Sequence, residues 1–274
     1  MELEIMGIKT SYWQHGEGKP IVNIHGYGLD HRVMEGCIEP VFSKIDNADN
    51  EWKRIYFDLP GMGTSEGADK ISCADEMLSF VLSFIDKIVG DEDFILVGYS
   101  YGGYLARAVA AKREKQVDRL FLLCPVVIPD KRRRKLTPHT VLEHDSEFMN
   151  QLSKSEVKDF EDFFVIQNRY TWERYLKEIK PALVEVDNDF IRRYYKEGYV
   201  FSFDKYDQGK YFDNFEGPTV ILTGRQDSVV GYEDVFPILE HYPKGTFIVL
   251  NGGGHSLQIE QESEFNHIFR NLLY

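Results

Sequence analysis

Cysteine is scarce in this chain of 274 residues, which contains only Cys37, Cys73 and Cys124. These three cysteines are an odd number, lie far apart and include no CxxC pair. The sequence therefore predicts neither a disulfide framework nor a cysteine-based zinc site. Free, buried thiols in a reducing compartment fit the pattern better.

Long apolar runs are also missing. The longest, such as Leu120–Leu123 and Val220–Leu222, are far shorter than the roughly 20 residues that a membrane-spanning helix needs. Residues 1–19 mix acidic with apolar side chains and lack the basic-then-apolar pattern of a signal peptide. We therefore expect a cytoplasmic protein without a membrane span.

Basic residues are outnumbered, because 45 Asp and Glu face 32 Lys and Arg and leave a net charge of −13. Such an excess of negative charge argues against nucleic acid as a partner. The sequence also has no P-loop, no GxGxxG fingerprint and no HExxH motif. We expect a small-molecule substrate, no cofactor and no metal, and the sequence gives no indication of oligomeric state.

Short apolar runs alternate with helical patterns along most of the chain. Continuous apolar runs of this kind are typical of strands buried on both faces of a parallel sheet. The pattern predicts an α/β fold with a doubly wound, mostly parallel sheet, and residues 1–14 are expected to add an antiparallel hairpin at its edge. The predicted strands are Ile21–Ile24, Arg54–Phe57, Phe94–Val97, Arg119–Leu123, Val220–Leu222 and Thr246–Leu250, and the predicted helices are Asp75–Val89, Tyr101–Lys112 and Gln258–Leu273.

The alternation breaks at residues 126–215, which show helical patterns and many aromatic residues. We expect this stretch to form a helical cap inserted into a core made of residues 1–125 and 216–274. Its aromatic side chains either line a substrate pocket or form the insertion's own core. The basic run Lys131–Lys135 is expected to be a solvated surface, because five like charges repel one another.

A GxSxG motif, Gly98-Tyr99-Ser100-Tyr101-Gly102, lies between a predicted buried strand and an alanine-rich helix. That strand–turn–helix context is the one that a nucleophile elbow requires. Glycine at 98 and 102 leaves room for the tight turn. The sequence therefore predicts Ser100 as a nucleophile whose oxyanion would form at a helix N-terminus.

Four motifs in this order make the chain similar to serine hydrolases of the α/β-hydrolase fold. They are His25-Gly26-Tyr27-Gly28, which resembles the HGxG oxyanion loop, the turn from Asp58 to Ser65, the elbow from Gly98 to Gly103, and Gly253-Gly254-His255-Ser256, which resembles the histidine loop. The resemblance covers nearly the whole chain and implies the α/β-hydrolase fold with a helical cap.

A serine nucleophile needs a base, and the base needs an orienting acid. His255 is the best base because it follows a predicted strand on a glycine loop; His25 is the rival, although the family uses a histidine there structurally. Asp227 gives the family's chain order Ser, Asp, His, with a salt bridge to Arg225 as the alternative role for this carboxylate. The family's other acid position, after Leu123, holds Cys124 and offers no carboxylate.

The resemblance also implies an oxyanion hole formed by the backbone N–H groups of Tyr27 and Tyr101. Their side chains are expected to line the pocket, with plain packing as the alternative. Trp172 and Tyr175, in the insertion, are further candidates for the substrate pocket.

Together these residues predict metal-free hydrolysis of a small or medium, fairly apolar carboxylic ester through an acyl-enzyme. The alternatives are a thioesterase, an amidase or peptidase, a C–C bond hydrolase, or a ligand receptor of the same fold that turns over slowly. The sequence alone does not place in the pocket the cationic groups that a C–C hydrolase of diketo acids would use.

Overall fold

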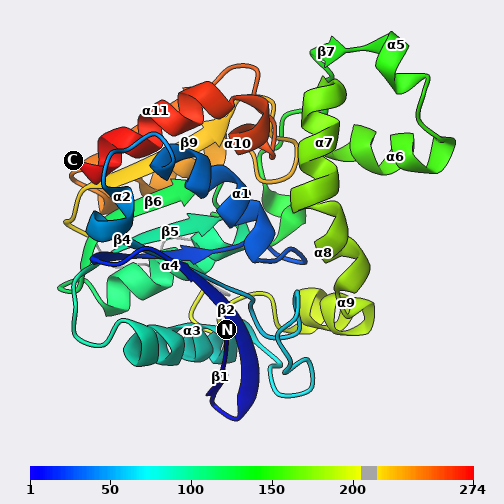
Figure 1. Ribbon diagram of the computed structural model, residues 1–274. Coiled ribbons are helices and arrows are strands. Elements are labelled where there is room, and N and C mark those ends of the chain that lie inside the picture. Colours follow the sequence, from blue (N-terminus) through cyan, green and yellow to red (C-terminus); the bar gives the residue numbers. More distant parts are fainter. Residues whose placement is uncertain (205–214) are drawn as a thin grey trace.

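A sheet of eight strands runs through the centre of the structure, a computed structural model that describes residues 1–204 and 215–274 (Figure 1). The strand order is β1-β2-β4-β3-β5-β6-β9-β10. The strands are β1 Glu2–Ile5, β2 Ile8–His15, β3 Lys19–Ile24, β4 Trp52–Phe57, β5 Phe94–Tyr99, β6 Val117–Leu123, β9 Thr219–Gly224 and β10 Gly245–Leu250.

The six strands predicted from apolar runs are confirmed, and from β4 to β10 all of them pair in parallel. Every residue of the central strand β5 is buried, as its sequence FILVGY requires. The predicted hairpin is confirmed too, since β1 pairs antiparallel with β2, and β2 pairs antiparallel with β4 at this edge of the sheet.

Helices cover both faces of the sheet. Helices α1 and α11 pack together on one face, and α3 and α4 pack together on the other (Figure 1). The helices of this core are α1 His31–Phe42, α2 Ala48–Glu51, α3 Ala74–Ile88, α4 Tyr101–Lys112, α10 Leu257–Glu260 and α11 Glu262–Leu273, with a 3₁₀ helix η2 at Glu233–His241.

Two helices differ from the sequence-based prediction. Helix α1 was not predicted, although the Asp30 side chain caps it by accepting the Arg32 N–H and its apolar face is buried. The helix predicted over Gln258–Leu273 is divided at Gln261, whose φ of −126° and ψ of 47° separate α10 from α11.

Residues 126–204, which we call the helical segment, project from one side of the sheet (Figure 1). Five α-helices dominate its described residues, as the sequence pattern indicates, and residues 205–214 of the expected insertion lie outside the described residues. Its elements are η1 Lys131–Arg133, β7 Glu143–His144, α5 Ser146–Met149, α6 Lys154–Phe163, β8 Ile166–Gln167, α7 Arg169–Glu178, α8 Lys180–Glu185 and α9 Asn188–Glu197.

None of the helices in residues 1–204 and 215–274 has both the length and the apolar character that crossing a membrane would require.

Candidate active site

Ser100 lies on a strained turn between β5 and α4. Its φ of +54° and ψ of −115° fall in a region that non-glycine residues rarely occupy. A Cβ at residue 98 would come within 2.4 Å of the Gly102 carbonyl oxygen, and one at residue 102 within 2.2 Å of the Ile24 carbonyl oxygen. Glycine at both positions is therefore required for the turn to form.

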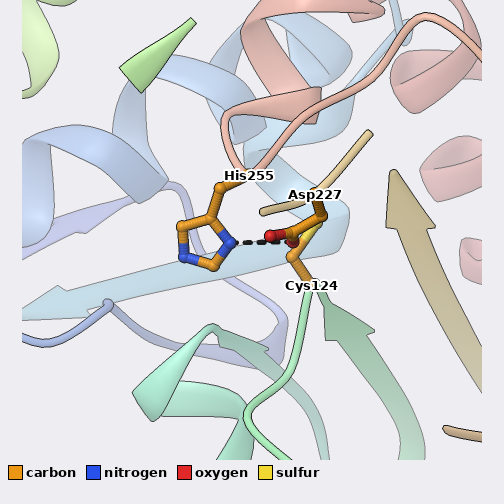
Figure 2. Close-up of side chains that lie close together, drawn as sticks. All are labelled: Cys124, Asp227 and His255. Atoms are coloured by element: carbon orange, nitrogen blue, oxygen red, sulfur yellow. Dashed lines mark hydrogen bonds and ion pairs between the residues drawn. The ribbon is translucent and has the colours of Figure 1, made fainter. Parts of the chain in front are cut away.

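Ser100, His255 and Asp227 form a hydrogen-bonded chain. The His255 Nε2 atom lies 3.0 Å from Ser100 Oγ, and its Nδ1 atom lies 2.9 Å from Asp227 Oδ2. Figure 2 shows the second of these contacts, with Cys124 beside the same carboxylate. The three residues follow β5, β9 and β10, so the carboxyl ends of three parallel strands bring them together.

Asp227 is fully buried, and its hydrogen bonds keep it ionised. Burial alone would raise the pKa of its carboxyl, but the neighbouring His255 and the N–H groups of Val229 and Val230, at 2.8 and 3.0 Å, outweigh burial and lower that pKa. Among the described residues, Arg225 makes no ion pair with Asp227, and its guanidinium lies over the Tyr232 ring instead.

His25, the rival base, is engaged elsewhere. Its Nε2 atom accepts the Leu59 N–H at 2.9 Å, and its Nδ1 atom lies 2.8 Å from the Gly26 carbonyl oxygen, to which it donates. Burial lowers the pKa of this imidazole, which favours its neutral form. His25 therefore fixes the loop that follows β3 and has no ring nitrogen left to activate Ser100.

The two predicted oxyanion donors flank the elbow. Tyr101 is the first residue of α4, and the first N–H groups of a helix have no acceptor within it. Gly26, just before Tyr27, packs so closely that an added Cβ would lie 3.3 Å from Ser100 Cβ. Within the described parts of the chain, neither the Tyr27 nor the Tyr101 N–H has a protein acceptor.

A cavity of about 350 Å³ opens above Ser100 and His255. Its walls are mainly apolar and aromatic, and two cationic side chains complete them. Besides Gly26, Ser100 and His255, the wall consists of Tyr27, Leu29, Tyr99, Val126, Lys131, Arg134, Phe163, Ile179, Leu183, Tyr195, Tyr199 and Val229.

The Tyr27 side chain lines this cavity, and its hydroxyl donates to the Ile191 carbonyl oxygen of α9. Tyr101 does not: its side chain is fully buried, with its hydroxyl 2.6 Å from that of Tyr194. For the Tyr101 side chain, packing was the correct alternative.

The prediction that Trp172 and Tyr175 line the pocket is wrong. Both are buried inside the helical segment, where their rings lie 5.5 Å apart and contact Phe160 at 5.2 and 5.9 Å. Neither belongs to the cavity wall, whereas Phe163 does. Phe160, Trp172 and Tyr175 thus belong to the core of the helical segment itself.

The sequence-based interpretation of the basic run as a solvated surface is only partly correct. Lys131 is exposed and Arg134 half-buried, and both line the cavity. The Arg134 guanidinium donates to the carbonyl oxygens of Ile128, Val229 and Pro129 at 2.7, 2.9 and 3.1 Å. The position of the run directly after β6, next to the elbow, was the available signal.

Glu260 is a second residue that the sequence did not identify. Its buried carboxylate accepts N–H groups from Gly254, beside His255, and from Val165 of the helical segment. Burial raises the pKa of Glu260 to about 7, although both hydrogen bonds oppose this rise. The residue joins the loop of His255 to the helical segment.

In the described part of the chain, two clusters place three possible metal ligands within 4.8 Å of one another: Cys124 with Asp227 and His255, and Asp30 with His31 and Asp58. In each cluster a carboxylate already accepts hydrogen bonds from a histidine ring nitrogen and from backbone N–H groups. A metal ion could bind either cluster only by replacing these hydrogen bonds, which already occupy the carboxylate oxygens.

Known proteins share this architecture. A sequence model of the alpha/beta hydrolase fold matches residues 19–262. A pimeloyl-[acyl-carrier protein] methyl ester esterase of Legionella pneumophila is 25% identical over 247 residues, which cover 88% of this chain and 90% of that protein. A 2-hydroxy-6-oxo-6-(2'-aminophenyl)hexa-2,4-dienoic acid hydrolase of Metapseudomonas resinovorans is 24% identical over 94% of this chain and 85% of its own length.

Among solved structures, an alpha/beta superfamily hydrolase from Oenococcus oeni PSU-1 superposes with a TM-score of 0.87. It is 33% identical in sequence, and the match covers 100% of this chain and 98% of that one.

Proposed function

This chain belongs to the alpha/beta hydrolase fold family, and from that premise we propose that it is a serine hydrolase that cleaves a small or medium carboxylic ester. The observation that carries the proposal is the continuous hydrogen-bonded chain from Ser100 Oγ through His255 to the buried, ionised Asp227. The relatives supply only the coarser statement that the fold is used by hydrolases.

The proposed reaction begins when Ser100 Oγ attacks the ester carbonyl and its proton passes to His255 Nε2. Asp227 accepts a hydrogen bond from Nδ1 and stabilises the imidazolium that forms. The negative charge on the carbonyl oxygen is stabilised by the N–H groups of Tyr27 and Tyr101. His255 then returns the proton to the leaving alcohol, and water repeats the sequence on the acyl-enzyme.

We also propose that the helical segment is a cap on a core formed by the rest of the chain. Support comes from Phe163, Ile179 and Leu183, which form part of the wall above Ser100. Tyr195 and Tyr199 of the same segment also line that wall, so the cap would set chain-length preference through both aromatic and aliphatic contacts. The three cysteines are free, which fits the cytoplasm that we propose as the location.

A C–C bond hydrolase is the second candidate. Lys131 and Arg134 supply the cationic side chains in the cavity that such an enzyme would use for an acidic substrate. The catalytic residues would be the same, so the distinction depends on which bond is cleaved in a substrate panel.

Labelling with a fluorophosphonate tests the proposal. Mass spectrometry should find one adduct, on Ser100, and Ser100→Ala should lose the adduct and reduce ester hydrolysis by about 10⁴-fold or more. Ser79→Ala is the matched control, because Ser79 is exposed on α3 and only bonds its own helix. Full activity in Ser100→Ala would refute the serine-hydrolase assignment.

A further inference from the structure

The wall of the cavity above Ser100 differs from the rest of this acidic chain in the sign of its charged side chains. Acidic residues outnumber basic ones by 45 to 32, yet the cavity wall contains Lys131 and Arg134 and no aspartate or glutamate. The side chains that form the wall are therefore positive on balance, in a protein of net charge −13.

Arg134 is held in place without a carboxylate. Three of its five N–H groups donate to backbone carbonyl oxygens, one each from Nε, Nη1 and Nη2. One N–H on each of the two Nη atoms is not used by these carbonyl oxygens, and the Tyr199 hydroxyl, which also lines the cavity, is a further partner of this guanidinium. A guanidinium placed in this way can still donate to a carboxylate. The nearby Asp234 accepts the Lys135 N–H and makes no ion pair with Arg134 in the described part of the chain.

Lys131 adds a second, mobile charge. It is exposed, and no hydrogen bond or ion pair engages its ammonium group within residues 1–204 and 215–274. Its neighbour Arg132 is different, because that guanidinium is bound to Asp130 at 2.9 Å. Asp234 is close enough for Arg134 to lower its pKa, but within residues 1–204 and 215–274 neither Arg134 nor Lys131 forms an ion pair, and both share one cavity with Ser100 and His255.

We propose that the natural substrate carries a carboxylate, separated by a short chain from the bond that is cleaved, and that Arg134 and Lys131 bind this carboxylate. This inference rests on the proposed function and narrows its substrate class. Five aliphatic side chains, Leu29, Val126, Ile179, Leu183 and Val229, also line the cavity and would contact the spacer. A cavity of about 350 Å³ is at the small end of ligand sites, so the spacer must be short.

The test compares each charged ester with a neutral counterpart of the same shape. For a carboxylate on the acyl side the pair is p-nitrophenyl hemiadipate and p-nitrophenyl 5-carbamoylpentanoate. For a carboxylate on the alcohol side the pair is the butyrate esters of 4-hydroxybenzoate and 4-hydroxybenzamide. We expect kcat/KM to favour the carboxylate by about tenfold or more in one pair, because a charged hydrogen bond is stronger than a neutral one. The preference should decrease as salt is added.

Variants assign the preference to the two cations. Arg134→Gln should remove most of this roughly tenfold preference, and Lys131→Gln should reduce it by about two- to fivefold, since exposed charges contribute less. The Lys131 ammonium group makes no hydrogen bond or ion pair in the described part of the chain, so this variant should fold and remains informative if Arg134→Gln unfolds. Arg133→Gln is the matched control, because Arg133 belongs to the same basic run but not to the cavity wall; the preference should not change.

The outcomes separate the two proposals. Ser100-dependent hydrolysis of the neutral esters with no carboxylate preference in either pair would overturn the substrate class and leave the serine hydrolase intact. A preference that Arg133→Gln reduces as much as Lys131→Gln would show that general surface charge is responsible, and would also overturn the inference. Absence of Ser100-dependent hydrolysis with all four esters would instead contradict the proposed function.

Discussion

Within residues 1–204 and 215–274, two histidines are hydrogen-bonded to buried aspartates at nearly the same distance. His255 Nδ1 lies 2.9 Å from Asp227, and His31 Nδ1 lies 2.8 Å from Asp58. Both carboxylates are fully buried, and both accept backbone N–H groups as well. The N–O distance, the burial of the carboxylate and its backbone hydrogen bonds therefore do not distinguish the two pairs.

They differ in what the imidazole ring faces. The second ring nitrogen of His255 lies 3.0 Å from Ser100 Oγ and borders the cavity. The ring of His31 stacks on Trp13, with centroids 3.3 Å apart and planes at 11°. Its backbone N–H also donates to Asp58, which ties the start of α1 to the turn after β4. An Asp–His pair is thus a way to hold an imidazole, and the group across the ring decides whether it can do chemistry.

Replacing each histidine by alanine should separate the pairs most sharply. His255→Ala should lower kcat by about 10⁴- to 10⁶-fold with little change in melting temperature, because Ser100 loses its base. His31→Ala should keep kcat within a few-fold but lower the melting temperature, because Asp58 loses its partner inside the fold. Steady-state kinetics and thermal unfolding of both variants measure this. Equal losses of kcat would mean that the two pairs are not functionally distinct.

Removing the charge of each carboxylate should give the next largest difference. Asp227→Asn should reduce kcat by about 10³- to 10⁴-fold, because the imidazole is held in the wrong orientation or tautomer. Asp58→Asn should cost about 1–3 kcal/mol of unfolding free energy, because a buried charged acceptor is lost. Urea unfolding and kcat, measured on the same preparations, test this. Wild-type turnover in Asp227→Asn would show that another group orients His255.

Acid should affect both pairs in the same direction, and this is the smallest effect. The pKa of Asp58 is lowered in the fold, where hydrogen bonds from His31 and Thr64 outweigh burial, and that of Asp227 is lowered as well. A lowered pKa stabilises the fold above the ordinary aspartate value near 3.9, and this stability is lost as pH falls through the folded-state value. Asp58→Asn should therefore show a flatter decline in unfolding free energy below about pH 4 than wild type. A decline as steep as that of wild type would count against this role of Asp58.

The fold and the candidate catalytic residues could be predicted because their signals are local in sequence. Gly98 and Gly102 are required by a single turn, and each residue of the proposed triad directly follows a strand that its own apolar run predicts. The His31–Asp58 pair could not be predicted, because its two residues are far apart in the sequence. Asp58 stood out within its turn motif, but nothing in the sequence indicated that α1 would bring His31 to it.

The walls of the cavity depend on packing between distant segments, which one sequence does not reveal. Trp172 and Phe163 have the same aromatic character, yet the first is enclosed by Phe160 and the second faces the cavity. Arg134 became part of the wall because the chain after β6 folds back, so that its guanidinium reaches the Val229 carbonyl. A pattern of charged or aromatic residues in the sequence does not indicate which of these side chains will face the cavity.

The Glu260 carboxylate joins two parts that must otherwise act separately. One of its oxygens accepts the N–H beside His255, and the other accepts the N–H of Val165. Any displacement of the helical segment that widens the entrance must either break the Val165 bond or pull on the loop that carries the base. The position of Val165 in the helical segment and the alignment of the loop that carries His255 are therefore coupled through one carboxylate.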